Sequence, residues 1–301
     1  MRRAIAALAV VLTVAAAAAC VEEVDENPLA AGSGSGSEEG SGGWLGERED
    51  AEEEVEDDLE EPIAPETGLD EQGDAPDVDT IVKAALLDVE AFWDRSYESA
   101  YGTPYEPISG GFWAYGPDTD LPPCGFEPFS YSDIAANAFY CPSDESIYID
   151  TAFFGTLSRN YGASEGPLAQ MYVLAHEWGH HISNLTGSLQ QVGRETGASS
   201  GSVRLELQAD CYAGAWVRDA SSTTDSAGVP LMKPVTQSEI TDALSAAAAV
   251  GDDHIQDLSG QRVNPDGFTH GTSEQRQRWF LVGYQTGPTA CDTFSVSASE
   301  L

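Results

Sequence analysis

The chain has 301 residues, with 13 Lys and Arg against 51 Asp and Glu, and its formal net charge is −38 at pH 7. So acidic a chain repels the phosphate backbone, which argues against nucleic-acid binding. About 220 residues remain from residue 80 onward, a length that suits one domain with a sizeable core.

Residues 1–20 are typical of an export signal. Arg2 and Arg3 precede an apolar run that ends at Ala19, and this run is too short for a comfortable membrane span. It closes on Ala-Ala-Ala-Cys, with Cys20 last, which resembles a lipobox, where the cysteine becomes the lipidated N-terminus. We therefore expect a lipid anchor on the extracytoplasmic face of the cell membrane. Ordinary signal cleavage near the same point, giving a secreted protein, is the alternative.

Residues 21–79 predict a disordered acidic linker. They hold 23 Asp and Glu but one basic residue, Arg48, and a Gly/Ser repeat at 32–37. Such a stretch cannot bury enough apolar surface to fold, and its like charges extend it. We interpret it as a tether between the membrane and a folded domain at 80–301. A binding segment for cations or basic partners is the alternative, although charge runs are usually just solvated.

The first part of this domain predicts a helix followed by strands. Residues 77–97 carry Ile81, Val89 and Trp93 among apolar side chains at helical spacing, which indicates a face packed in the core. Residues 98–150 are rich in Pro, Gly and Tyr, and the best strand candidates within them are 112–115 and 146–150.

The pattern His-Glu-x-x-His at His176, Glu177 and His180 predicts a zinc site. An α-helix advances about 100° per residue, so His176 and His180 share a face and can bind one ion, while Glu177 can reach a metal-bound water. His181 points about 100° away from His180 and should not share the metal.

The residues around this pattern predict that it lies on a buried helix. Pro167 suits the first turn, Ser164 is a candidate cap, and Gly187 is a natural stop. Between them, apolar residues recur at helical spacing from 168 to 182.

A second helical stretch at 202–216 offers the third metal ligand. Glu206 and Asp210 are four residues apart and share a face. We expect Glu206 to bind the ion and Asp210 to accept a hydrogen bond from a ligand histidine, which would fix the tautomer of that histidine. The exchanged roles, with Asp210 on the ion, and a solvated acidic face are the alternatives.

The cysteines agree with export. With Cys20 set aside for the lipid, four remain, and they allow three pairings. We favour Cys124 with Cys141, which closes a short loop, and Cys211 with Cys291, which ties the C-terminal tail to the helix of Glu206. Disulfides persist in oxidising compartments. Cysteine zinc ligands are the competing interpretation, but no close pair has metal-site spacing.

The C-terminal part predicts two more helices and two further histidines of interest. Thr236 and Glu239 form a capping-box pattern before an alanine-rich helix that runs to Ala249. Thr272 is a fair N-cap for the last helix. His270 could donate a hydrogen bond to the oxyanion of peptide hydrolysis, and a buried histidine bonded to backbone is the alternative. His254 has the same two interpretations.

Several ordered blocks resemble the bacterial putative neutral zinc metallopeptidases, a zincin family. They are residues 140–142, 147–150, 175–181, 205–211, 251–254 and 268–276, and the resemblance covers roughly 80 to 295. It implies an α+β, zincin-like fold, a small sheet packed on several helices with zinc between two of them. In zincins an edge strand commonly lies beside the cleft and pairs with an extended substrate, and 146–150 is the candidate by this analogy.

These observations lead to one hypothesis. His176, His180 and Glu206 hold one Zn²⁺, and Glu177 is the general base of an exported metallopeptidase. The expected partners are a peptide or protein substrate and, through the lipid anchor, the membrane. A surface lipoprotein with a binding role and structural zinc, or a zinc amidase that acts on cell-wall material, are the alternatives.

Overall fold

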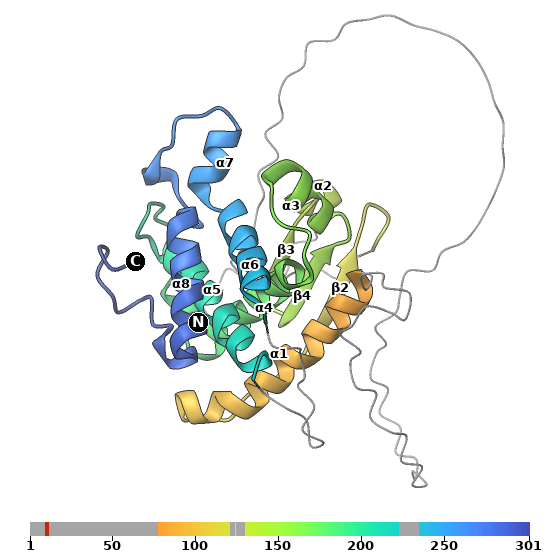
Figure 1. The fold of residues 1–301 in the computed structure, drawn as a ribbon, viewed down its shortest axis with the longest axis vertical. Helices are drawn as coiled ribbons and strands as arrows, with labels where there is room; N and C mark the ends of the chain where they lie inside the picture. Colours follow the sequence, from red (N-terminus) through yellow and green to blue (C-terminus); the bar gives the residue numbers. More distant parts are fainter. Residues whose placement is uncertain (1–9, 12–77, 121–123, 125–129, 223–234) are drawn as a thin grey trace, which may run out of the picture.

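The computed structural model describes residues 10–11, 78–120, 124, 130–222 and 235–301. Most of the expected export signal, Cys20 and nearly all of the expected linker lie outside these residues. Within them the chain forms helices and one small sheet (Figure 1), which confirms the α+β class.

The sheet has the strand order β1-β3-β4-β2. Its strands are β1 (Val10–Val11), β2 (Gly111–Tyr115), β3 (Ala138–Cys141) and β4 (Ser146–Asp150). β4 pairs antiparallel with β3 and parallel with β2, and β1 pairs antiparallel with β3. Side chains alternate between the two faces of a strand. Ile147 and Ile149 therefore pack on the helices, whereas Tyr148 joins a smaller cluster on the other face.

The prediction that residues 146–150 form an edge strand is wrong. β4 is an inner strand, with β3 on one side and β2 on the other. The alternation of β4 identifies it as a strand but carries no information about its neighbours. β3 pairs with β4 across the tight turn at 142–145, and β2, which comes earlier in the chain, pairs with the other side of β4.

The helices described by the structure include the predicted ones, of which the first helix and the helix of Glu206 run further than expected, and several additional ones. They are α1 (Val78–Tyr101), α2 (Tyr131–Ile134), α3 (Phe153–Tyr161), α4 (Pro167–Leu185), α5 (Gly201–Ala220), α6 (Gln237–Ala249), α7 (Asp252–Leu258) and α8 (Ser273–Thr286), with short 3-10 turns at Leu189–Gln191, Pro265–Gly267 and Pro288–Ala290. The predictions omit α2, α3 and α7, because these helices are short. No helix within the described ranges combines the length and hydrophobicity that a membrane crossing needs.

Helix starts follow the expected capping chemistry in three cases out of four. Pro167 begins α4, and capping boxes at Thr236 and Thr272 start α6 and α8. The expectation that Ser164 caps α4 is wrong, since the N-cap is Gly166. Ser164 instead donates to Asp242 at 2.7 Å, which ties the entry of α4 to α6.

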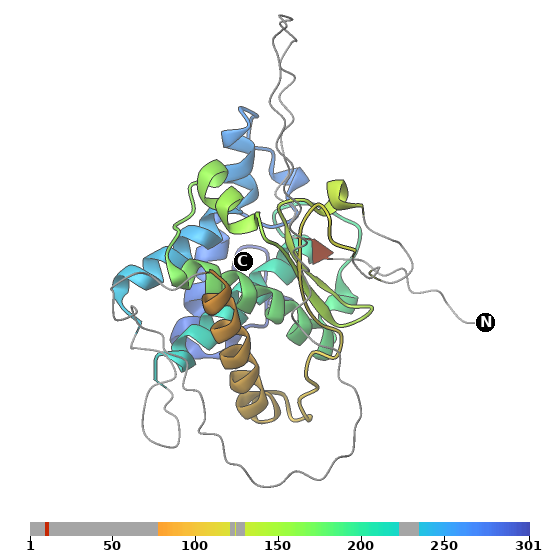
Figure 2. The ribbon, with the colours of Figure 1, turned by 90° about the vertical axis from the view of Figure 1, so that its right-hand side faces the viewer.

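α4 occupies the centre of the fold. It contacts β3, α1, α5 and α6, and Figure 1 shows the sheet on one side of it and α5 and α8 on the other. Figure 2 shows that α1 and α7 lie towards opposite ends of the molecule, as they do in Figure 1. The two helices that carry the predicted metal ligands, α4 and α5, are therefore held from several directions.

Glycines allow α5 to approach its neighbours closely. A Cβ at Gly283 of α8 would lie 1.8 Å from the carbonyl oxygen of Cys211, and one at Gly214 would lie 2.0 Å from that of Phe280. Across the other interface, a Cβ at Gly179 of α4 would lie 2.8 Å from Cα of Ala209. Any larger residue at these positions would push the helices apart.

The structure contains two disulfides, Cys124–Cys141 and Cys211–Cys291, the pairing favoured from the sequence. The second ties α5 to the C-terminal tail. Gln208 supports the same junction, because its side chain donates to the carbonyl of Cys291 at 2.9 Å.

Candidate metal centre

Side chains from α4 and α5 converge at one buried point. His176 and His180 come from α4 and Glu206 from α5, and one ligand atom from each lies within 4.8 Å of the others. Nε2 of His176 is 3.2 Å from one carboxylate oxygen of Glu206, and Nε2 of His180 is 3.5 Å from the other. Two imidazoles and a carboxylate are a donor set that suits Zn²⁺.

Asp210 lies behind this group, one helical turn from Glu206. It contacts Nδ1 of His176 at 2.8 Å and accepts a hydrogen bond from the hydroxyl of Tyr172. Because an aspartate can only accept, Nδ1 of His176 carries a proton, and Nε2, on the side of Glu206, is the nitrogen that can bind an ion once its own proton is lost. The geometry therefore supports the arrangement in which Glu206 holds the ion and Asp210 orients His176.

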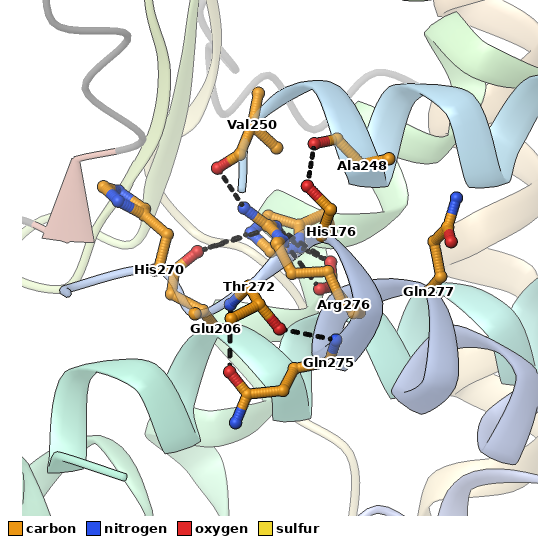
Figure 3. Close-up of polar contacts among 12 residues, drawn as sticks. His176, Glu206, Ala248, Val250, His270, Thr272, Gln275, Arg276 and Gln277 are labelled. Atoms are coloured by element: carbon orange, nitrogen blue, oxygen red, sulfur yellow. Dashed lines mark hydrogen bonds and ion pairs between the residues drawn. The ribbon is translucent and has the colours of Figure 1, made fainter. Parts of the chain in front are cut away.

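Arg276 completes the contacts of Asp210. Its Nε and Nη2 donate to the two oxygens of Asp210 at 2.8 and 2.9 Å, a two-pronged contact that suits the planar guanidinium. Figure 3 shows Arg276, from the start of α8, reaching the same place as His176. The centre is thus assembled from three helices.

Glu177 is fully buried next to this group. Neither of its carboxylate oxygens makes a hydrogen bond of normal geometry within the described residues. Burial raises the pKa of Glu177 to about 8, with Glu206 adding to the rise and the charge of His176 opposing it. A buried polar group without a partner is costly, so its position suggests a ligand or water as its partner. This observation fits a hydrolytic metal site.

The same residues perturb one another's protonation. Burial alone would lower the pKa of His176, but Asp210 and Glu206 raise it to about 9. Burial lowers the pKa of His180 to about 3. Burial opposes ionisation of Glu206 and Asp210, yet their cationic neighbours keep both pKa values below the usual range.

His270 lies in the loop before α8, and Asp252 fixes that loop. One oxygen of Asp252 accepts the backbone N–H groups of Thr269, His270 and Gly271 at 2.8, 2.7 and 2.9 Å. The other oxygen is 3.2 Å from Nδ1 of His270. Burial opposes protonation of His270, but Asp252 and Glu206 raise its pKa.

The other histidines have structural contacts. His181 bonds to the hydroxyl of Tyr140 at 3.0 Å and to the carbonyl of Glu106 at 2.8 Å, so it lies off the metal group as predicted. His254 contacts the carbonyl of Tyr161 at 2.9 Å, in agreement with its structural interpretation.

Sequence reasoning assigned no part in the metal centre to Arg276, Tyr172 or Asp252. A signal for Arg276 exists, because it precedes Trp279, Phe280 and Gly283 at spacings of three, four and seven. These four residues are the buried face of α8. An apolar helix face is usually buried, so a charged residue on it needs a buried partner of opposite charge.

A buried His-His-Glu group with an unsatisfied glutamate beside it is the pattern of a zinc hydrolase. The sequence model of the putative neutral zinc metallopeptidase family matches residues 61–294, and the chain belongs to this family.

Curated relatives share about half of the chain. An uncharacterized protein of Mycobacterium tuberculosis strain H37Rv is 55% identical over 163 residues, which cover 53% of this chain and 55% of that protein. The uncharacterized protein YpfJ of Escherichia coli K12 is 43% identical over 166 residues, which cover 53% and 54%. The chain therefore spans about half the length of the curated relatives that it matches. No solved structure matches the chain.

Proposed function

We propose that this protein is an exported zinc-dependent endopeptidase that cleaves peptide bonds in extended polypeptides. The observation that carries the proposal is Glu177, which is 0% exposed, lies beside His176, His180 and Glu206, and has no hydrogen bond of normal geometry within the described residues. A carboxyl group that is buried next to a ligand group, with no hydrogen bond of normal geometry, is placed to act on a water molecule.

The three ligand side chains have distinct tasks in this proposal. His176 and His180 offer their Nε2 lone pairs and Glu206 its carboxylate, and Asp210 holds His176 in the required tautomer. When bound, zinc lowers the pKa of a coordinated water and polarises the scissile carbonyl.

Glu177 carries the proton. Its carboxylate accepts a proton from the attacking water and passes it to the leaving amine. Its raised pKa suits this task, because a group that titrates near neutral pH can both take up and release a proton. His270, which Asp252 holds in place, donates to the oxygen on which negative charge develops.

The edge of β3 that pairs with β1 supports binding of an extended substrate in the place of β1. β3 packs against α4, and Tyr140 of β3 is close enough to Glu177 for its backbone to lower the pKa of that carboxyl slightly. Val10 and Val11 pair antiparallel with Tyr140 and Phe139, so this edge accepts a backbone strand. A peptide in that position would lie beside Glu177.

The two disulfides indicate an oxidising, extracytoplasmic compartment. Anchoring through lipidated Cys20 and tethering by the acidic segment 21–79 belong to the proposal. They are supported by the sequence alone, since both lie outside the described residues except at 78–79.

The test combines metal content and turnover on the same samples. We expect one zinc per chain in wild type and in Glu177→Gln, and cleavage of a mixed peptide library by wild type only. Glu98→Gln, at an exposed position of α1, is the matched control and should cleave normally. Full activity of Glu177→Gln would overturn the mechanism. Zinc without cleavage by any variant would favour a binding role or a cell-wall amidase, and no zinc would refute the site.

A further inference from the structure

Arg276 is the only buried residue among the described Lys and Arg side chains. Besides its two-pronged contact with Asp210, its guanidinium lies 3.4 Å from the carbonyl of Val250 and 3.4 Å from the hydroxyl of Tyr172. It also lies 3.7 Å from the carboxylate of Glu206. One cation therefore touches both acidic residues of α5 that build the centre.

Arg276 brings to the centre a positive charge that does not depend on pH. Three carboxylic residues, Glu177, Glu206 and Asp210, are buried within the centre. Arginine is always protonated in proteins. Before the ion binds, Arg276 is the one permanent positive charge of the centre.

The start of α8, which carries Arg276, is fixed by contacts outside the ligand group. The start of α8 is fixed by the capping box of Thr272. It is fixed again by Asp253, whose side chain accepts the backbone N–H of Ser273 at 2.8 Å. These contacts lie in the loop and helix start outside the ligand group, so the backbone at Arg276 is held in place independently of the ligands.

We propose that Arg276 is a positioning residue that keeps the metal centre assembled before the ion arrives. It serves as a permanent counter-charge for Asp210 and Glu206, so that the ligand geometry is set by folding rather than by metal binding. The inference rests on the proposed function only in taking the His-His-Glu group as a zinc site.

Removal of this charge has a defined consequence. In Arg276→Met, the metal-free protein would bury Asp210 and Glu206 without their permanent cation, which is strongly destabilising. Zinc would bring positive charge to Glu206, which Arg276 also contacts, so the variant should gain more stability from zinc than wild type does. If Arg276 had a purely structural role, its replacement would cost the protein the same stability with and without zinc.

The experiment measures the melting temperature of the full chain with excess chelator and with saturating zinc, for wild type, Arg276→Met, Arg276→Lys and Arg204→Met. Arg204 is the matched control, since it lies on α5 but binds tail carbonyls, including that of Val296 at 3.0 Å. We expect metal-free Arg276→Met to melt about 10 °C below wild type, and zinc to recover at least half of that loss. Zinc should raise Arg204→Met and wild type equally.

Arg276→Lys separates charge from shape. Lysine keeps the positive charge but not the planar, two-pronged guanidinium. The rise in melting temperature that zinc causes in Arg276→Lys should therefore be close to that of wild type. Equal zinc-induced rises in Arg276→Met and wild type would overturn the inference. If Arg276→Met stayed unfolded at saturating zinc, that would also overturn the inference. If Arg276→Met refolded when zinc was added, that would support the inference. If zinc failed to stabilise wild type, the zinc site itself would be refuted.

Discussion

Replacement of Glu177 by glutamine should stabilise the metal-free protein, and the gain should depend on pH. Burial raises the pKa of Glu177 from its usual 4.5 to about 8 in the folded state. Between these values the unfolded chain ionises Glu177 while the folded chain keeps the proton. The stability associated with this group is therefore fully present below pH 4.5 and is lost as the pH rises through about 8.

The magnitude follows from the displacement of the pKa. Each pH unit in this window costs about 1.4 kcal/mol, so the loss between pH 4.5 and pH 7 is about 3 kcal/mol. Glutamine does not ionise, so Glu177→Gln escapes this loss. His176 titrates in both proteins, and its contribution cancels in the difference to first order.

The assay is urea unfolding with excess chelator at pH 4.5, 5.5, 6.5 and 7.5, followed by tryptophan fluorescence. We expect the free energy of unfolding of Glu177→Gln, minus that of wild type, to rise by about 3 kcal/mol from pH 4.5 to pH 7. Glu98→Gln should show no such trend. A difference that is constant with pH would refute the assignment of the buried, protonated carboxyl to Glu177.

Two further predictions concern ion binding and helix packing. The pKa of His176 is raised to about 9 in the metal-free protein, so zinc must displace a proton from His176 at pH 7, and the affinity for zinc should rise with pH and level off above about pH 9. Calorimetry in two buffers of different ionisation enthalpy measures the proton release. Zinc binding without proton release would contradict the assignment to His176. Gly283→Ala should lower the free energy of unfolding by about 2 kcal/mol or more, because its Cβ would meet the carbonyl oxygen of Cys211. Gly116→Ala, where the nearest atom is 3.7 Å away, is the control, and equal losses in the two variants would refute the packing argument.

The local part of the site was predictable from the sequence. Residues four apart on one helix share a face, and this single rule placed His176 with His180 and Glu206 near Asp210. The capping boxes at Thr236 and Thr272 are equally local, since each involves residues only three positions apart.

The non-local part was not predictable in the same way. Strand order depends on which segments meet in space, and the periodicity of β4 did not reveal that β3 and β2 flank it. Ser164 could have capped α4, but a partner 78 residues away, Asp242, binds its hydroxyl instead. Arg276 reaches Asp210 across 66 residues, and only the apolar character of its helix face hinted at the contact.

The assembly of the centre from three helices also sets an order of events during synthesis. A chain that has been made only as far as α5 already contains His176, His180 and Glu206. It lacks Arg276, and it lacks Cys291, which closes the disulfide to the helix of Glu206. We therefore expect an incomplete chain to carry all of the metal-binding side chains without the means to hold them, so that hydrolytic capacity appears only after α8 has docked in a compartment where the disulfide can form.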